Sequence, residues 1–483
     1  MRLRSAIGAF IVLVSFAGIW PAIADTIVLK NGRRIVVDSA TETVDRVSGV
    51  TSAGEISLPK SMVERIEHTP VAQIPSTSAN AEASFLPITP PAESRDGVFD
   101  PAVIAKTLHD GAIDFGYLSQ VDQEVLTGGS SAAFRASVAH HAAAQFELMH
   151  GDVTTAIDQE RRALALQPEN ALLLLNIGYG HLRLSEFSSA LEYLEKAKRV
   201  APDSADVAKL MGWAYYGLNR IPDAVAEWKR AQKIQPDPEV AKALEKAERD
   251  ARAEVGFREG QTTHFVIHYT GDAAPLLAGE ILRTLEIHFG QISAMLDYTP
   301  PEPIGVILYT DQQFQDITRA PSWAGAINDG RIRIPIQGLT SVTDDLSREL
   351  RHELTHSFLQ QKMRGHCPTW IQEGVAQWME GRRVGKGAGA LLNAYDQQAA
   401  IPLRDLDLSW MNLSGSGASF AYGWSLAVIE SILSTGSMDD LTHLLDSIAN
   451  GKSAEAAVRD IFHESYTELD QQTADYLRRT YSF

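Results

Sequence analysis

The stretch His352-Glu353-Leu354-Thr355-His356, with Glu373 following in Trp370-Ile371-Gln372-Glu373-Gly374-Val375-Ala376, organises the interpretation of this chain. Two histidines four positions apart on a helix lie on one face, about 40° apart around the axis, so both imidazoles can reach one Zn²⁺. Glu353 lies at the edge of that face, where a carboxylate can take a proton from a metal-bound water without binding the metal. A third ligand from Glu373 would leave the fourth position open, as in catalytic zinc sites.

The pattern around the motif predicts a helix from Thr343 to Lys362. Its i, i+4 apolar stripe consists of Leu346, Leu350, Leu354 and Phe358. Gly365 and Pro368 then break the helix, and a second helix is predicted from about Trp370 to Glu380. The alternative is a solvated helix that carries two histidines by chance, and the setting of Glu373 argues against it.

These residues resemble the gluzincin metallopeptidases. The motif H-E-L-T-H, a helix-breaking stretch and then P-T-W-I-Q-E-G-V-A-Q-W are most similar to the peptidase MA-like bacterial proteins, over roughly the last 220 residues. The resemblance implies an α+β zincin-like domain in which His352, His356 and Glu373 bind zinc and Glu353 is the general base and proton shuttle. It also implies an edge strand beside the cleft, for which Arg331 to Ile336 is the candidate.

The chain departs from thermolysin-type members at one position. Those members carry an Asp four residues after the ligand Glu, where it orients a zinc-binding histidine, whereas this chain has Gln377. An amide or another carboxylate must therefore orient the imidazole. Several gluzincins also use a downstream Tyr or His to stabilise the oxyanion, and Tyr422 is the candidate here; the alternative is an ordinary core aromatic.

Four further residues near or before the motif are weaker candidates. His366 lies at the expected turn and is interpreted as a surface residue or a residue that supports the ligands. Cys367, the only cysteine, is interpreted as a partly buried bystander, and it excludes an intramolecular disulfide. His264 and His268 fall on one face of a predicted strand, but surface or cross-strand pairing is favoured over a second metal site.

Length and composition indicate an exported multidomain protein. The 483 residues predict two to four domains, and the net charge of −18 argues against a nucleic-acid-binding surface. Residues 1–24 read as a signal peptide, with Arg2 and Arg4 before a short apolar run and a cleavage site at Ala22-Ile23-Ala24. We therefore expect a periplasmic or extracellular location in a bacterium, with no stable membrane span after cleavage; an uncleaved anchor is the alternative.

Two segments precede the helical part of the chain. Residues 25–70 predict a small β domain, SH3-like or a meander, with a hairpin turn at Lys30-Asn31-Gly32-Arg33. Residues 71–97 are rich in Pro, Ser and Ala and predict a linker.

A 34-residue period runs through the region 98–256, which is predicted to be helical. The period relates small residues and prolines in four sets: Ala144, Gly178 and Gly212; Ala156, Ala190 and Ala224; Ala163, Ala197 and Ala231; and Pro168, Pro202 and Pro236. This pattern resembles about three tetratricopeptide repeats over 137–236, followed by a capping helix, and the resemblance implies an all-α solenoid whose groove binds a protein partner. Tyr179, Tyr215 and Tyr216 are candidates to line that groove.

Residues 260–483 are predicted to form the gluzincin-like domain. It begins with a strand at 264–269, a helix at 276–296 and a strand at 304–309, and it ends in helices at 424–433, 438–449, 454–462 and 466–480. The sequence predicts an exported zinc metallopeptidase that cleaves peptide or protein substrates, with repeats that bind a partner. Two alternatives stay open: a catalytically silent scaffold, and a zinc amidase acting on cell-wall peptides.

Overall fold

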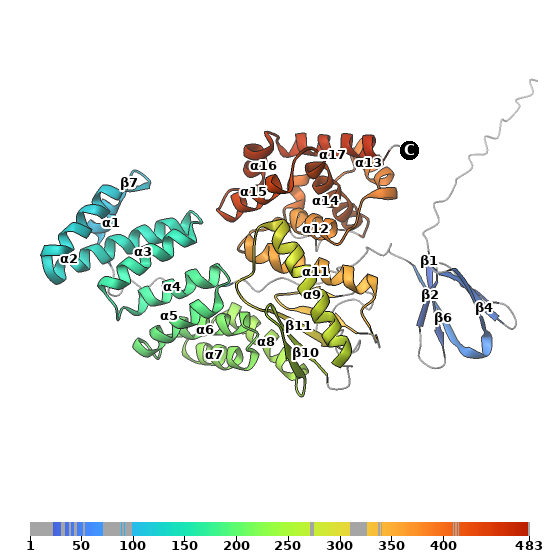
Figure 1. The fold of residues 1–483 in the computed structure, drawn as a ribbon, viewed down its shortest axis with the longest axis horizontal. Helices are drawn as coiled ribbons and strands as arrows, with labels where there is room; N and C mark the ends of the chain where they lie inside the picture. The colour runs from blue at the N-terminus through green and yellow to red at the C-terminus, as the bar shows by residue number, and fades with distance from the viewer. Residues whose placement is uncertain are drawn as a thin grey trace, which may run out of the picture. The chain divides into compact units, whose positions relative to one another are not determined.

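The chain divides into two compact units, one ending at Ser76 and the other beginning at Thr77 (Figure 1). The computed structural model describes residues 23–29, 34–37, 40–42, 46–51, 54–70, 88, 91, 99–270, 275–309, 326–336, 339, 341–408, 410, 413 and 415–481. The predicted signal peptide up to residue 22 and most of the predicted linker lie outside these residues.

The first unit contains two three-stranded antiparallel sheets, ordered β2-β1-β6 and β3-β4-β5. Its elements are β1 (Ile23–Leu29), β2 (Arg34–Val37), β3 (Ala40–Glu42), β4 (Arg46–Thr51), β5 (Gly54–Pro59), η1 (Lys60–Met62) and β6 (Val63–Pro70). The predicted turn at 30–33 lies outside the described residues, but β1 and β2 on either side of it pair with Val28 opposite Arg34. β1 includes Ile23 and Ala24, which precede the predicted cleavage point.

The second unit begins with stacked helices. They are α1 (Pro101–Thr107), α2 (Phe115–Met149), α3 (Val153–Leu166), α4 (Ala171–Arg183), α5 (Phe187–Val200), α6 (Ala205–Gly217), α7 (Ile221–Ile234) and α8 (Pro238–Ala253), with a short hairpin of β7 (Leu108–His109) and β8 (Ala112–Ile113) after α1. Small residues of the 34-residue period lie where paired helices cross. A Cβ added at Gly212 on α6 would meet the Trp228 ring of α7 at 2.3 Å, so only glycine permits this packing.

A five-stranded sheet follows, ordered β12-β13-β11-β10-β9. Its strands are β9 (Arg258–Gln261), β10 (Phe265–Tyr269), β11 (Ile304–Tyr309), β12 (Ile327–Asn328) and β13 (Ile332–Pro335), and α9 (Pro275–Leu296) connects β10 to β11. The prediction that Arg331 to Ile336 forms the edge strand was wrong. Asp329-Gly330 turns the chain back, so β12 pairs antiparallel with β13 and takes the edge, while β13 pairs on its other side with β11 in parallel.

The remaining chain is helical and closes over the sheet (Figure 1). It comprises α11 (Asp344–Lys362), α12 (Thr369–Met379), η2 (Gly385–Gly387), α13 (Ala388–Asp396), η3 (Leu403–Leu406), α14 (Gly415–Thr435), α15 (Met438–Ala449), α16 (Ala454–Phe462) and α17 (Tyr466–Thr480). One hydrophobic core joins these helices to α9 and the sheet. The predicted class, a small β unit with a helical repeat and an α+β domain, is confirmed. None of the described helices combines the length and apolarity that a membrane span requires.

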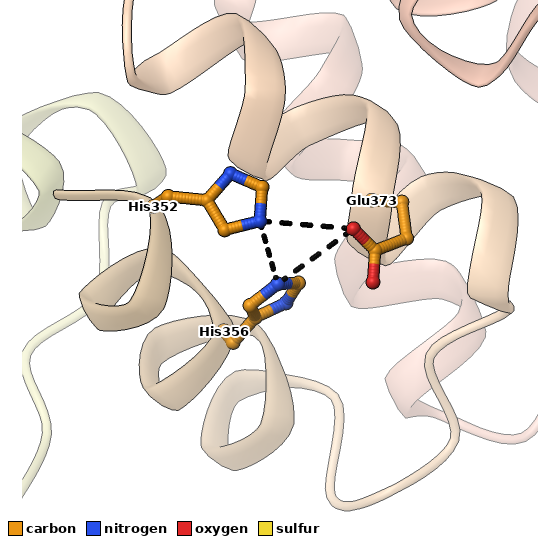
Figure 2. Close-up of side chains that lie close together, drawn as sticks. All are labelled: His352, His356 and Glu373. Atoms are coloured by element: carbon orange, nitrogen blue, oxygen red, sulfur yellow. Dashed lines mark hydrogen bonds and ion pairs between the residues drawn. The ribbon is translucent and has the colours of Figure 1, made fainter. Parts of the chain in front are cut away.

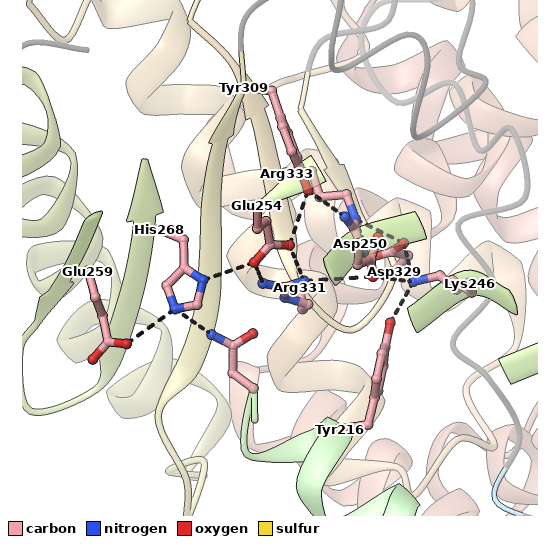
Figure 3. A network of polar contacts seen from close by, with 11 residues as sticks. Tyr216, Lys246, Asp250, Glu254, Glu259, His268, Tyr309, Asp329, Arg331 and Arg333 are labelled. Atoms are coloured by element: carbon pink, nitrogen blue, oxygen red, sulfur yellow. Dashed lines mark hydrogen bonds and ion pairs between the residues drawn. The ribbon is translucent and has the colours of Figure 1, made fainter. Parts of the chain in front are cut away.

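A buried charged network joins α8 to the hairpin of β12 and β13 (Figure 3). Arg331 donates two hydrogen bonds to Glu254, at 2.6 and 2.7 Å. Arg333 donates to Asp250 at 2.8 Å and to Asp329 at 2.9 Å. Both arginines are about 1% exposed, and a buried charge is tolerated only when it is paired. The last helix of the repeat region is therefore part of the packing of the sheet.

The same network reaches further into the repeats. Lys246 of α8 donates to the Tyr216 hydroxyl of α6 at 2.6 Å and pairs with Asp329 at 2.7 Å. The Nδ2 atom of Asn219, which follows α6, lies 3.2 Å from Nε2 of His268 on β10. Helix α8 and the turn after α6 therefore both contact the sheet or its hairpin. These contacts fix the hairpin relative to the repeats.

Candidate metal centre

Helix α11 presents the two motif histidines to the interior. Thr343 caps the helix by accepting a hydrogen bond from the Leu346 N–H at 3.1 Å. The predicted apolar stripe is buried and packs into the core beside α9. This orientation leaves His352 and His356 on the side that faces α12, where they are 1% and 4% exposed.

Helix α12 brings Glu373 to the histidines because it lies very close to α14. A Cβ on Gly374 would stand 2.5 Å from the Ser425 carbonyl oxygen, so the residue after Glu373 must be glycine for the two helices to approach. Between α11 and α12, Arg364 and Gly365 both have positive φ, at 53° and 78°, and they reverse the chain. The predicted break after the first helix is therefore a tight turn that aligns the second.

The three predicted ligands converge on one point (Figure 2). The Nε2 atoms of His352 and His356 are 3.1 Å apart, and Glu373 Oε2 lies 3.7 Å from the first and 3.8 Å from the second. A point equidistant from these three atoms lies about 2.1 Å from each, within the roughly 2.0–2.2 Å of zinc–nitrogen and zinc–oxygen bonds. The donor set, two imidazoles and a carboxylate, fits Zn²⁺ in kind as well as in spacing.

Glu380 places a carboxylate beside His352, where the sequence left the orienting group open. Its Oε2 lies 3.2 Å from His352 Nδ1, and its Oε1 pairs with Arg382 Nε at 2.7 Å. Gln377 does not take this role, because its amide donates to the backbone carbonyls of Glu373 and Tyr422 at 3.1 and 3.0 Å. Glu380 follows Glu373 by two helical turns, which is the periodicity that could have identified it.

Replacing Glu380 with glutamine is expected to weaken zinc affinity about 10- to 100-fold, because a ligand histidine loses the carboxylate that holds its tautomer and orientation. Competition with a chelator of known affinity would measure this. Arg383→Gln, which changes an exposed neighbour outside the ion pair, is the matched control. An unchanged affinity in the Glu380 variant would refute the orienting role.

Burial and neighbouring charges prepare the cluster for a cation. Burial lowers the pKa of His356 to about 4, so this imidazole is neutral and free to coordinate. Although burial lowers the pKa of His352, hydrogen bonding to Glu373 and Glu380 raises it to about 10. Burial raises the pKa of Glu353 well above its usual value, and other carboxylates nearby raise it further. A divalent cation among these groups would lower the pKa of each, which opposes the upward shifts of His352 and Glu353 and adds to the downward shift of His356.

The edge strand holds the motif helix in place. Asn328 of β12 donates from its Nδ2 to the Glu353 backbone carbonyl at 2.7 Å and to the Ser357 hydroxyl at 2.6 Å. Its Oδ1 accepts from the Gly330 N–H at 3.1 Å, which also shapes the turn. β12 thus borders the site and fixes the turn of α11 that carries Glu353. No pattern in the sequence pointed to this amide.

The other candidates near the motif, Tyr422, His366 and Cys367, are not among the three groups that converge. Tyr422 is half-buried on α14, its ring packs edge-on against Trp410 at 5.0 Å, and its backbone is bonded to Gln377. His366 is exposed after α11, and burial raises the pKa of Cys367 far above its usual value.

The paired histidines of the sheet form no metal cluster among the residues that the structure describes. His264 Nδ1 lies 2.7 Å from Glu286, and His268 Nδ1 lies 2.9 Å from Glu254. A carboxylate partner therefore accounts for each histidine, on α9 for His264 and directly after α8 for His268, whereas the sequence favoured surface or cross-strand pairing.

Comparison with known protein families gives two matches. Residues 291–478 match the Peptidase MA superfamily, and residues 181–247 match the tetratricopeptide repeat. The first range contains the whole His352, His356 and Glu373 cluster, and the second contains α5 to α7. A search of curated proteins found none that matches this chain.

Proposed function

We propose that this chain, which carries a Peptidase MA superfamily domain behind tetratricopeptide repeats, is an exported zinc metallopeptidase. The observation that carries the proposal is the convergence of His352, His356 and Glu373 within metal-binding distance, with the buried Glu353 on the same helix. Export is supported by the signal-like sequence of residues 1–24.

Each residue has a defined part in peptide hydrolysis. His352, His356 and Glu373 would hold Zn²⁺, which on binding lowers the pKa of water to about 7 and polarises a carbonyl. Glu353 takes a proton from the attacking water and passes it to the leaving amine. Its buried position excludes bulk water, and Asn328 holds the backbone at this point of α11.

Two further groups support the reaction. Glu380 positions the His352 ring through Nδ1. Tyr422 is proposed to donate a hydrogen bond from its hydroxyl to the oxyanion. Its place on α14, beside the helix that carries Glu373, supports this role. The repeats would bind a protein substrate or partner and so bring peptide chains to the domain.

Zinc content and cleavage of a broad peptide library, measured on the full chain and on His356→Ala, test the proposal. We expect about one zinc per wild-type chain and cleavage of peptides, with both lost in the variant because two ligands do not retain the metal. Unchanged zinc in His356→Ala would refute the ligand assignment.

The same measurement separates the alternatives. Zinc without cleavage of any peptide would favour a silent scaffold. Cleavage confined to peptidoglycan fragments, added to the library as a separate panel, would favour an amidase acting on cell-wall peptides.

A further inference from the structure

A cavity of about 420 Å³ lies where the repeats meet the sheet. Helices α4 and α6 form one side of it, and the start of β11, the Asp329-Gly330 turn and the end of α11 form the other. The residues that line it do not include the His352, His356 and Glu373 cluster or Glu353. The volume is within the range of ligand-binding pockets, so the cavity, here called the junction pocket, is large enough for a short peptide segment.

One wall of the junction pocket is aromatic and apolar. Tyr179, Phe187, Trp213 and Tyr216 come from the repeats and face it. Ile88, which precedes the repeat region in the chain, also lines the pocket and packs against the repeat core. The wall therefore already accommodates an aliphatic side chain from outside the repeats, and it would accept an apolar side chain of a ligand.

The opposite corner gathers positive charge. Arg183 Nη2 lies 3.3 Å from His366 Nε2, and Arg364, also in the lining, donates to the Gly151 carbonyl at 3.1 Å. Partial desolvation, followed by repulsion from Arg183 and Arg364, lowers the pKa of His366. Across the described part of the chain, neither arginine has a carboxylate within ion-pair distance. Asp152 and Asp446 attract Arg364 only at longer range.

The acidic residues of the lining are engaged elsewhere. Glu302 accepts a hydrogen bond from the Ser188 N–H at 2.8 Å, at the start of α5, and Asp329 binds Arg333 and Lys246. They therefore do not neutralise the arginine corner. A ligand that carries a carboxylate would supply the missing charge.

Two buried polar groups of the lining also lack a hydrogen-bond partner among the described residues. They are the indole N–H of Trp213, whose side chain is 4% exposed, and the amide oxygen of Gln361. Leaving such groups unpaired is unfavourable. A peptide backbone offers an acceptor for the indole and a donor for the amide oxygen, so it can satisfy either group.

We propose that the junction pocket binds a short peptide in which a carboxylate adjoins an apolar side chain. The carboxylate binds at Arg183 and Arg364, the apolar side chain packs on the aromatic wall, and backbone peptide groups bond to Trp213 and Gln361. The carboxylate can be a C-terminus or an acidic side chain. This binding does not require hydrolysis at the metal centre.

Fluorescence anisotropy with the full-length Glu353→Gln variant tests the proposal without turnover of the probe. The fluorescein-labelled probes are Ala-Gly-Ala-Gly-Ile-Phe with a free C-terminus, its C-terminal amide, and the amide extended by Glu. Binding of the first and third probes, with loss of binding for the plain amide, is expected if either carboxylate suffices. Binding of the first or the third alone also supports the proposal and identifies the carboxylate source.

Substitutions locate the binding. Arg183→Gln with Arg364→Gln is expected to weaken the carboxylate probes at least about tenfold, because two charge-assisted hydrogen bonds are lost. Trp213→Phe, which keeps an aromatic ring and removes the donor, is expected to weaken them about three- to tenfold. Arg220→Gln, a repeat arginine outside the lining, is the matched control.

Folding is verified by circular dichroism, and Arg183→Gln alone replaces the double variant if that variant is unfolded. Two results would overturn the proposal. One is the absence of saturable binding for every carboxylate probe. The other is equal affinity in the arginine variant and the Arg220 control.

Discussion

Glu353→Gln is expected to lower kcat for peptide cleavage by about 10²–10⁴-fold while zinc content stays at the wild-type level. Glu353 is 2% exposed, and its carboxylate is not among the three groups that converge on the metal position. Glutamine keeps the size of the side chain, and the backbone bond to Asn328 does not depend on it. The change therefore removes proton transfer and leaves the ligands in place.

Glu349→Gln is the control for this variant. Glu349 is a half-buried carboxylate one turn earlier on α11, and its Oε1 accepts from the Ala326 N–H at 2.5 Å. An amide oxygen can accept the same bond, so this variant should keep zinc and most of the activity. Equal loss in both variants would mean that any neutralised carboxylate on α11 disturbs the site, and loss of zinc in Glu353→Gln would make Glu353 a ligand.

Much of the fold follows from local signals in the sequence. Helices α15, α16 and α17 and strand β11 have the bounds that the sequence predicts. The helices begin after Ser437, Ser453 and Ser465, whose side chains cap them, and their apolar periodicity matches the buried faces. Such elements are predictable because caps and periodicity act within a few residues.

The site was predictable to the extent that it depends on helix geometry. His352 and His356 share a face because they are four residues apart. Glu373 follows a turn that Gly365 and Pro368 predict. Glu380 was missed because the two-turn spacing from Glu373 shows only that both lie on one face of α12, while its distance from His352 also depends on the angle between α11 and α12. The edge strand was misplaced because β12 has two residues and carries no strand signal of its own.

The contact between the repeats and the sheet could not be predicted from the sequence, for a related reason. The alternation in Arg331-Ile332-Arg333-Ile334 is that of a strand with one polar face, and sequence reasoning gives such a face to solvent. The charged pattern of α8 likewise predicts an exposed capping helix. In the structure the two polar faces bury each other, which is a tertiary fact that each segment alone cannot reveal.

Glu254→Gln is expected to lower the free energy of unfolding by about 3–5 kcal/mol, because it leaves the buried Arg331 guanidinium without its main partner. Both hydrogen bonds of Arg331 in the network go to Glu254, which also lies 2.9 Å from His268 and accepts from the Tyr309 hydroxyl at 3.4 Å. The next carboxylate, Asp250, is 3.7 Å from Arg331 and already binds Arg333. Denaturant unfolding followed by circular dichroism would measure the loss. Glu259→Gln, an exposed neighbour of His268, is the matched control.

A double variant and a pH series distinguish an uncompensated charge from general disruption. Glu254→Leu with Arg331→Met removes both charges and should recover much of the stability, since an apolar pair of similar volume often replaces a buried ion pair at little cost. Although burial raises the pKa of Glu254, Arg331 lowers it from 4.5 to about 2. The ionised carboxylate therefore stabilises the fold above the unfolded-state pKa and stops doing so as the pH falls toward 2. The difference in stability between wild type and Glu254→Gln should shrink over that interval. A constant difference would show that the pair does not hold α8 to the sheet electrostatically. A double variant less stable than the single one would show the same.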